Sequence, residues 1–405
     1  MENTKKVPIL RFPEFSGDWE KRTIENEIDF LSGYPFDGKD ITEDKNGKNL
    51  MRGINITEGY IRHNKDIDKY YLGKIESLQK YLLKENDLVI GMDGSKVGKN
   101  SALIRKNDVD TLLVQRVARL RAKKYSSIEF IYQHIISNKF HSYVDKVNTS
   151  SGIPHISAKQ IKEFEISFPT FPEQQKIADF LTQIDNKINQ LSQKKQLLER
   201  YKKGVMQQIF SQEIRFTDDD GREFPEWEET SLGKIAKVNP KSSFLPDEFI
   251  YIDLESVEKG VLLKETTIFR NEAPSRAQRV LDKGDILFQM VRPYQRNNLF
   301  FNKDGSYVAS TGYAQIRTNE NAQFIYQALQ LNSFVDEVMN RCTGTSYPAI
   351  NSSELAIISI IIPCLKEQTK IANFLTALDE KIALVEKQLH GTKQYKKGLL
   401  QQLFV

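Results

Sequence analysis

The sequence has few of the residues that support covalent or metal-dependent chemistry. It contains two cysteines, Cys342 and Cys364, and five histidines, which are His63, His134, His141, His155 and His390. The cysteines lie in different surroundings without clustered partners, and no two histidines are spaced i, i+4. A disulfide framework, a zinc site and a histidine-based triad are therefore not expected. Unpaired thiols instead indicate a reducing, cytoplasmic location.

Long apolar runs are also missing. No stretch approaches the 18 apolar residues of a membrane-spanning helix, and MENTKKVPILRF at the start lacks the apolar segment of a secretory signal. We therefore expect no contact with a membrane. The net charge of +4 and the pI of about 8.7 are compatible with nucleic-acid binding without being diagnostic of it. A chain of 405 residues predicts two or three domains.

Motifs that hold a cofactor or a catalytic metal are incomplete. GSKVGK at 94–99 resembles a phosphate-binding loop, but its two glycines are one residue too close and Asn100 replaces the usual Ser or Thr. VNPKS at 238–242 lacks the Asn-Pro-Pro-aromatic loop of adenine methyltransferases. PDEFIYIDLE at 246–255 carries carboxylates without the Glu-x-Lys of a metal nuclease. We therefore predict no catalytic site, no metal and no cofactor in this chain.

The most regular stretch is 171–210, where apolar residues recur at alternating steps of four and three. This is the a/d pattern of a helix packed along another helix. At about 1.5 Å per residue, 38 residues form a rod of roughly 57 Å. The seam residues are Ile177, Leu181, Ile184, Ile188, Leu191, Leu198, Val205 and Ile209, with Lys195 and Lys202 as polar breaks.

The same stretch returns at the C-terminus. A shift of 194 aligns residues 173–210 with 367–404 without a gap, and 18 of the 38 pairs are identical. Its seam comprises Ile371, Leu375, Leu378, Ile382, Val385, Leu389, Leu399 and Leu403, with Thr392 and Lys396 as polar breaks. An intramolecular antiparallel pair is favoured over ordinary core packing or a homodimer zipper, because each helix supplies the partner that the other lacks.

The two mixed regions before these helices also resemble each other. GINI at 53–56 and YIDL at 251–254 are predicted as short strands, and NDLVI at 86–90 corresponds to GDILF at 284–288. Each of 130–140 and 324–334 is predicted as one amphipathic helix. SSGIPHIS at 150–157 and GTSYPAIN at 344–351 are predicted as loops that re-enter a strand.

The predicted fold class is therefore α+β, with two mixed α/β heads in a pseudo-twofold repeat, separated by two long antiparallel coiled-coil helices. The domains are an N-terminal arm 1–19, head 1 at 20–170, a central helix at 171–212, head 2 at 213–363 and a C-terminal helix at 364–405. The helices are nearly alike and the heads are not, which is expected if the helices meet identical partners and the heads meet different surfaces.

Loops in both heads carry cationic and amide side chains, the groups that commonly contact bases and phosphates. RPYQRNN at 292–298 is the most suggestive of them. An ordinary solvated surface is the alternative for each loop alone. The candidate DNA-binding residues are Arg62, His63, Asn64, Lys65, Ser95, Lys96, Lys99, Asn100, Thr149, Ser150 and Ser151 in head 1, and Arg276, Arg279, Arg292, Tyr294, Gln295, Arg296, Asn297, Asn298, Thr345, Ser346 and Tyr347 in head 2.

Three features carry a resemblance to a known family: the helix pair FPEQQKIADFLTQIDNKI and KEQTKIANFLTALDEKI, the helix ends YKKGVMQQIF and YKKGLLQQLF, and the RFPEF…W opening. With these features the whole chain resembles specificity subunits of type I restriction–modification systems. The resemblance implies a non-catalytic subunit whose two target recognition domains each read half of a bipartite DNA sequence. It also implies two methyltransferase subunits that use S-adenosylmethionine to methylate adenine N6, and restriction–translocase subunits that use ATP and Mg.

Two other classes of function stay open from the residues alone. One is a coiled-coil scaffold with two protein-binding heads, and the other is a fused restriction–methylation enzyme, which the missing cofactor motifs disfavour. Gly204 and Gly398, at matched positions inside the helices, are also open. Each costs about 1 kcal/mol relative to Ala, so they either permit a close helix crossing or mark an early helix end.

Overall fold

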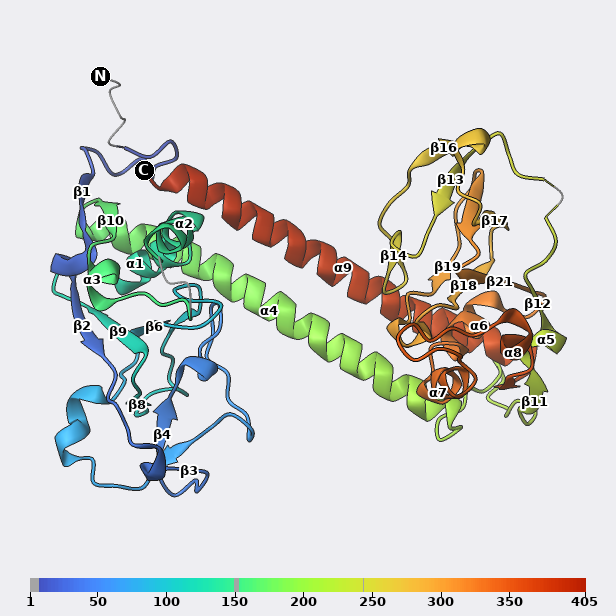
Figure 1. Cartoon of the computed structure of the whole chain (residues 1–405), viewed down its shortest axis with the longest axis horizontal. Helices are drawn as coiled ribbons and strands as arrows, with labels where there is room; N and C mark the ends of the chain where they lie inside the picture. The colour runs from blue at the N-terminus through green and yellow to red at the C-terminus, as the bar shows by residue number, and fades with distance from the viewer. Residues whose placement is uncertain (1–6, 149–152, 243) are drawn as a thin grey trace. The chain divides into compact units, whose positions relative to one another are not determined.

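The computed structural model describes residues 7–148, 153–242 and 244–405. The chain divides into two compact units, of which unit 1 is Met1–Ser192 with Lys387–Val405 and unit 2 is Gln193–Glu386. Each unit thus combines one head with a segment of each long helix (Figure 1). Each is described by itself below.

Head 1 is built on an antiparallel sheet with the strand order β2-β9-β6-β7. Its second sheet has the order β3-β5-β4-β8, in which β4 and β8 are parallel. The strands are β2 Ile28–Ser32, β3 Ile41–Thr42, β4 Lys48–Met51, β5 Tyr70–Tyr71, β6 Leu88–Gly91, β7 Ser101–Leu103, β8 Leu112–Leu113 and β9 Val117–Ala122, and β1 Glu20–Thr23 pairs with β10 Glu165–Phe168. The predicted apolar strand at 86–90 is confirmed as β6, which is buried over its whole length.

Head 2 repeats the first sheet in the order β12-β21-β18-β19, whereas its second sheet has the order β16-β13-β20-β17. The predicted strand at 284–288 is confirmed as β18. The strands are β12 Ala236–Val238, β13 Glu248–Ile252, β14 Val257–Glu258, β15 Val261–Leu262, β16 Thr267–Phe269, β17 Ala277–Val280, β18 Ile286–Gln289, β19 Leu299–Phe300, β20 Tyr307–Ser310 and β21 Tyr313–Thr318, and β11 Glu228–Ser231 pairs with β22 Ser359–Ile362. The first sheets of the two heads therefore have the same strand order, whereas the second sheets differ in an edge strand.

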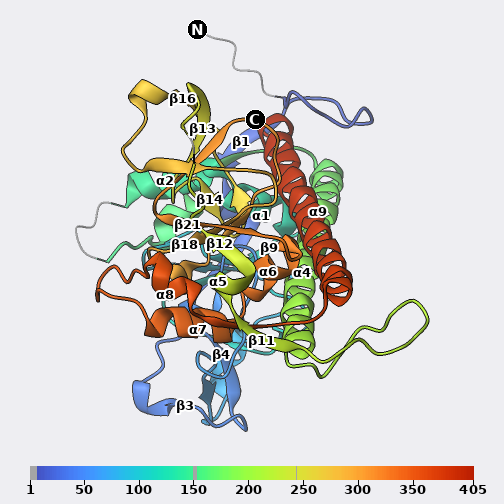
Figure 2. The ribbon, with the colours of Figure 1, turned by 90° about the vertical axis from the view of Figure 1, so that its right-hand side faces the viewer.

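Seven short α-helices lie in the described parts of the heads, and Figure 2 shows those of unit 2. They are α1 Ile128–Ile135, α2 Asn138–Val147, α3 Ala158–Lys162, α5 Leu232–Ile235, α6 Ala322–Ala328, α7 Asn332–Asn340 and α8 Ser352–Ala356. The prediction of one helix over 130–140 and over 324–334 is wrong, because each stretch is divided into two helices. In head 1 the Ser137 hydroxyl accepts a hydrogen bond from Phe140 N at 3.4 Å and so caps a new helix.

The strand predicted at 53–56 is also wrong, because Gly53–Asn55 is a 3-10 helix. Asn55 is 1% exposed. Its Oδ1 accepts from the Arg52 backbone N–H at 3.2 Å, and its Nδ2 donates to Asp68 Oδ1 at 3.0 Å. These contacts fold the backbone into a turn. The strand at 251–254 is right only for its first half, since β13 ends at Ile252.

The long helices are α4 Phe171–Phe210 and α9 Leu365–Leu403. All the predicted seam residues are buried or half-buried. In unit 2, Lys202 lies 2.7 Å from Asp379 and Lys195 lies 2.6 Å from Glu386. From the first pair to the second, the residue number in α4 falls by seven while the residue number in α9 rises by seven. The two helix segments are therefore antiparallel within this unit. Coiled-coil packing over the full length of the helices stays a prediction.

Unit 1 contains the matching pair, Lys396 to Asp185 at 2.6 Å. Asp185 and Lys396 correspond to Asp379 and Lys202 after the shift of 194. Each aspartate also accepts a hydrogen bond from a head glutamine, which is Gln133 in unit 1 and Gln327 in unit 2, both at 2.9 Å. The same polar triad therefore joins head and helices in each unit.

A Glu-Gln pair that occurs at the start of both long helices, Glu173-Gln174 and Glu367-Gln368, links each helix to its head. Glu173 is 1% exposed and accepts two hydrogen bonds from Arg11, both at 2.8 Å. Gln174 accepts from the Ser127 N–H at 3.1 Å and donates to Pro169 O at 3.0 Å. In unit 2, Glu367 and Gln368 make the corresponding bonds to Arg215, Asn321 and Pro363. Removing one partner from such a buried pair costs roughly 3–5 kcal/mol, so the motif supports the head–helix junction.

Neither explanation of the matched glycines fits. Both helices continue past them, Gly204 being followed by six helical residues and Gly398 by five. A Cβ built on either glycine meets no described atom within 4 Å, so no helix crossing within the chain requires them. Both therefore lie at open positions. None of the helices in the described ranges is long and apolar enough to cross a membrane.

Candidate functional site

The candidate site of each head lies where one inner strand of its first sheet ends, which is β6 in head 1 and β18 in head 2. We call residues 92–100 after β6 exit loop 1, and residues 290–298 after β18 exit loop 2. In head 1, Met92 N donates to Arg116 O at 2.9 Å, and Ile156 N donates to Met92 O at 2.9 Å. Gly94 N donates to Pro154 O at 3.0 Å. These backbone bonds bring the β8–β9 turn and the segment at 153–156 beside exit loop 1.

Exit loop 2 is held by corresponding bonds. Met290 N donates to Gly312 O at 3.0 Å, Ile350 N to Met290 O at 3.1 Å, and Arg292 N to Pro348 O at 2.7 Å. Thr311 N also donates to Arg276 O at 2.8 Å. Three predicted groups, at 276, 292–297 and 345–347, are therefore brought to one end of head 2 although they are distant in sequence.

In head 1, Lys96 pairs with Glu58 at 2.8 Å and Lys99 lies 3.8 Å from Asp145. Ser95 is exposed and Asn100 is half-buried. The predicted residues Thr149, Ser150 and Ser151 lie outside the described residues.

The predicted residues at 62–65 largely shape their own turn. Arg62 Nε donates to Ile54 O at 2.9 Å, and Asn64 Oδ1 accepts from two backbone N–H groups. His63 lies between Asp68 at 3.3 Å and Asp108 at 3.0 Å. Lys65 is exposed. Contact with DNA by these residues stays a prediction.

In head 2, several predicted side chains have partners within the fold. Gln295 Oε1 accepts from Gln289 Nε2 at 2.9 Å, Asn297 Oδ1 accepts from Lys259 N at 3.1 Å, and the buried Asn298 Oδ1 accepts from Gln289 N at 2.8 Å. Arg296 donates to Gln330 O at 2.9 Å. These contacts shape exit loop 2.

Other predicted side chains of head 2 are more available. Tyr294, Thr345, Ser346 and Tyr347 are exposed, as is Arg276. Arg279 is half-buried, its Nε has no hydrogen-bond partner among the described residues, and burial lowers the pKa of its guanidinium. This end of head 2 therefore presents the exposed cation of Arg276 beside exposed hydroxyl and aromatic groups, which suits recognition of an anionic, hydrogen-bonding polymer.

One residue of the site was missed from the sequence. Arg116 lies in the β8–β9 turn with a φ of 67°, its side chain is 63% exposed, and its Nε lies 4.0 Å from Asp93 Oδ2 in exit loop 1. Its place beside the loop depends on strand pairing, so only its position between two apolar strand segments could have suggested it. Within the described ranges, no group of three or more His, Cys, Asp or Glu residues could hold a metal ion.

The model of the type I restriction modification DNA specificity domain matches the chain twice, over residues 16–200 and 225–392. The chain belongs to this family. The first match covers head 1 and the second covers head 2 from residue 225 onward, each with most of the long helix that follows, so the internal repeat is a repeat of the family's domain. The chain is accordingly a specificity subunit of the type I restriction–modification class, in which DNA sequence recognition resides.

Two curated relatives cover nearly the whole chain. The specificity subunit of type I restriction enzyme MjaVIII from Methanocaldococcus jannaschii is 24% identical over 441 residues, which cover 99% of this chain and 95% of that protein. The putative MjaX specificity subunit of the same organism is 26% identical over 433 residues, with coverage of 99% and 96%. A crystal structure of the type I restriction-modification S subunit from M. genitalium has the same fold, with a TM-score of 0.66, 18% identity, and coverage of 98% of this chain and 99% of that one.

Proposed function

We propose that this specificity subunit is non-catalytic and that each head reads one half of an asymmetric, bipartite DNA target. The observation that carries the proposal is the contrast between the heads. They share the strand order of the first sheet and the backbone bonds that hold the exit loops, yet exit loop 1 contains GSKVG where exit loop 2 contains RPYQR. A common scaffold with unlike side chains suits two half-sites of different sequence, because side chains that contact base edges determine which bases are recognised.

The long helices hold the spacing of the two half-sites in this proposal and dock two methyltransferase subunits. Tyr201 is 53% exposed and Tyr395 is 57% exposed, and the two tyrosines occupy matched positions on α4 and α9. Gly204 and Gly398 follow them by three residues, on the same helix face. Equivalent open faces on two like helices suit two identical partners.

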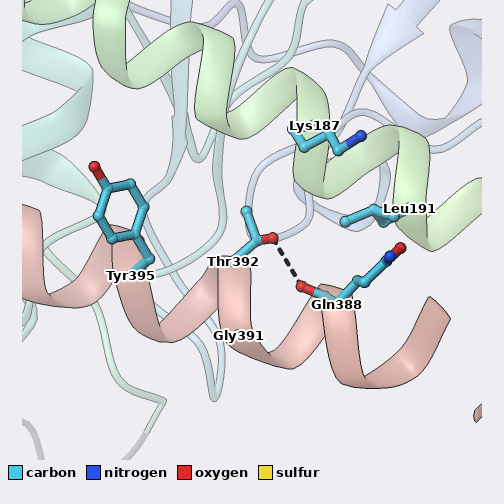
Figure 3. A pocket seen from close by; sticks show the side chains of 6 residues that line it. All are labelled: Lys187, Leu191, Gln388, Gly391, Thr392 and Tyr395. Atoms are coloured by element: carbon cyan, nitrogen blue, oxygen red, sulfur yellow. Dashed lines mark hydrogen bonds between the residues drawn. The ribbon is translucent and has the colours of Figure 1, made fainter. Parts of the chain in front are cut away.

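A groove of about 470 Å³ adjoins one of these tyrosines in unit 1 (Figure 3). Lys187 and Leu191 of α4 lie opposite Gln388, Thr392 and Tyr395 of α9, and the Thr392 hydroxyl donates to Gln388 O at 2.7 Å. A groove with lysine, amide and tyrosine at its walls is a natural place for a partner side chain to insert.

The chemistry of the proposed complex belongs to its other subunits. The methyltransferases bind S-adenosylmethionine, rotate an adenine out of the duplex and methylate its N6 atom, and the restriction–translocase subunits use ATP and Mg for cleavage. A cytoplasmic location, where genomic DNA and these partners are found, is part of the same proposal.

The decisive experiment exchanges residues 20–165 for the corresponding head of another family member and maps the methylated sites by single-molecule sequencing of the genome. One half of the recognised sequence should change while the other half and the spacer stay the same. The reciprocal exchange of head 2 should change only the other half. If both halves change in either exchange, or neither half does, the assignment of one head to one half-site is wrong.

The role of the helices is tested by lengthening them without disturbing their pairing. Seven residues, about two turns, are inserted between Lys195 and Gln196 and another seven between Val385 and Glu386. The insertions keep the Lys195–Glu386 pair on one side and the Lys202–Asp379 pair on the other. The spacer of the methylated motif should lengthen by about one base pair per 3.4 Å of added helix. A spacer of unchanged length would contradict the proposal.

A further inference from the structure

The backbones of the two exit loops are alike at two unusual positions. In exit loop 1 these are Gly94, with a φ of 90°, and Gly98, with a φ of 71°. In exit loop 2 the same positions hold Arg292, with a φ of 53°, and Arg296, with a φ of 55°. Both loops are thus left-handed at the same places, but in head 2 the conformation that glycine adopts readily is adopted by arginine, at a cost in free energy.

Arg296 has a structural use that accounts for its presence. Its guanidinium donates to Gln330 O at 2.9 Å and to Asn332 Oδ1 at 2.8 Å. These bonds tie exit loop 2 to the α6–α7 connection and to the first residue of α7, so the strained arginine at this position stabilises the loop.

Arg292 has no such bonds. Within the described part of the chain its guanidinium makes no hydrogen bond or ion pair. It lies over the ring of Tyr347, 4.4 Å from the centroid, and Tyr347 is itself 63% exposed. A guanidinium stacked on an aromatic face is held in orientation while the N–H donors along its edge stay free.

The backbone fixes both members of this stack. Arg292 N donates to Pro348 O at 2.7 Å, and Val291 forms a β-bridge with Ala349. Arg292 and Tyr347 therefore lie on two segments that these backbone bonds join next to the stacked side chains. The arrangement is a preorganised pair of free donors at the end of head 2 where the predicted DNA-contacting loops meet.

We propose that Arg292, oriented by Tyr347, reads a guanine in the half-site of head 2 through paired hydrogen bonds to O6 and N7. Arginine is the side chain that most often makes this contact, because its two parallel N–H groups match the two acceptors of guanine. Head 1 has Gly94 at this place, so the contact exists in one half-site only. The inference rests on the proposed function and adds the base and the residue that reads it.

The test uses the assembled methyltransferase complex carrying Arg292→Gly, and maps its methylated sites by genome sequencing. Glycine suits the left-handed backbone, so this variant should fold. We expect head 2 to lose its preference for guanine at one position, with affinity for the cognate duplex about 10- to 100-fold lower. Arg292→Lys, which keeps the charge but cannot form the paired contact, should relax the same position.

The matched control is Lys259→Gly, which replaces an exposed basic residue of head 2 that likewise has a positive φ, 49°, and which keeps the backbone N–H that donates to Asn297 Oδ1. Its methylated motif should be that of the wild type. If Arg292→Gly retains the wild-type motif with affinity within twofold, or if the relaxed position is not a guanine of the head 2 half-site, the inference is wrong. If Arg292→Lys restores the motif, Arg292 contacts a phosphate and the inference is again wrong. A wild-type complex without a bipartite motif would instead refute the proposed function.

Discussion

At the scale of the residue, His134 shows how one buried group makes stability depend on pH. It is 2% exposed, stacks on Phe404 with 4.0 Å between ring centroids, and its Nε2 has no partner among the described residues. Burial, and secondarily the charge of Lys139, lowers its pKa to about 3. The imidazole is therefore neutral in the folded protein over the ordinary pH range.

Because the pKa of His134 is lower in the folded state than the 6.5 of the unfolded chain, the unfolded state gains a proton first as the pH falls. The contribution of this group is complete above about pH 6.5 and is lost progressively toward pH 3. At pH 5 the loss is about 2 kcal/mol relative to pH 8. His134→Leu should remove this loss, as measured by urea unfolding at both pH values. An equal pH dependence in the variant and the wild type would refute the assignment.

Individual residues also show what could be predicted from sequence. The seam at Ile177 and Leu181 was predictable, because a period sustained over forty residues has one simple structural solution. The wrong prediction of a strand at 53–56 could not have been avoided, because the Asn55 contacts that form a turn there come from Arg52 and the distant Asp68. Ser137 is equally ambiguous, since a serine inside a helical pattern can be either an ordinary helical residue or a cap.

At the scale of the element, the lysines of the seam differ in burial although they share one register. The Lys396 side chain is 10% exposed and that of its partner Asp185 is 28% exposed, whereas Lys195 and Glu386 are 23% and 59% exposed. We expect Lys396→Met to destabilise unit 1 by about 2 kcal/mol, because it leaves Asp185 without its cation. Lys195→Met should cost less than about 1 kcal/mol. Urea unfolding of both variants measures the difference, and equal costs would contradict the role of burial.

The matched glycines give a second prediction for the helices. Gly204→Ala and Gly398→Ala should each stabilise the chain by about 1 kcal/mol, because the new methyl group meets no described atom within 4 Å. The control is Ala383→Gly, at an exposed position of α9, which should lower stability by a similar amount. Thermal melting measures all three. If partners pack against these faces, the same alanines should weaken methyltransferase docking.

At the scale of the whole molecule, the salt dependence of binding separates a DNA reader from a protein-binding scaffold. A complex that neutralises about six phosphates should lose roughly 10³-fold in affinity for its duplex between 50 and 200 mM salt. Fluorescence anisotropy with labelled duplex, on the chain assembled with its methyltransferase, measures this slope. A flat salt response together with no preference for the cognate duplex would favour the scaffold.

The duplication, the long helices and the mixed heads were all predictable at this scale, because the repeat can be read from one chain. How the separate segments of the site come together was harder to predict from the sequence. Arg292 was identified from composition, but its pairing with Tyr347 depends on backbone bonds between segments more than fifty residues apart, and Arg116 was missed for the same reason. The residues that contact DNA stay predictions until the variants above are measured.

The lysine–aspartate–glutamine triad has a consequence for how such a chain can change over time. Because Asp185 and Lys202 recur as Asp379 and Lys396, a genetic crossover between the codons for Asp185 and Lys202 exchanges head 1 together with two members of its triad, the glutamine and the aspartate, while Lys396 stays in place. An incoming head that carries the matching glutamine and aspartate therefore completes the triad with the retained lysine. On the proposed function, a single crossover should thus give a new DNA specificity without a period of selection to repair the helices.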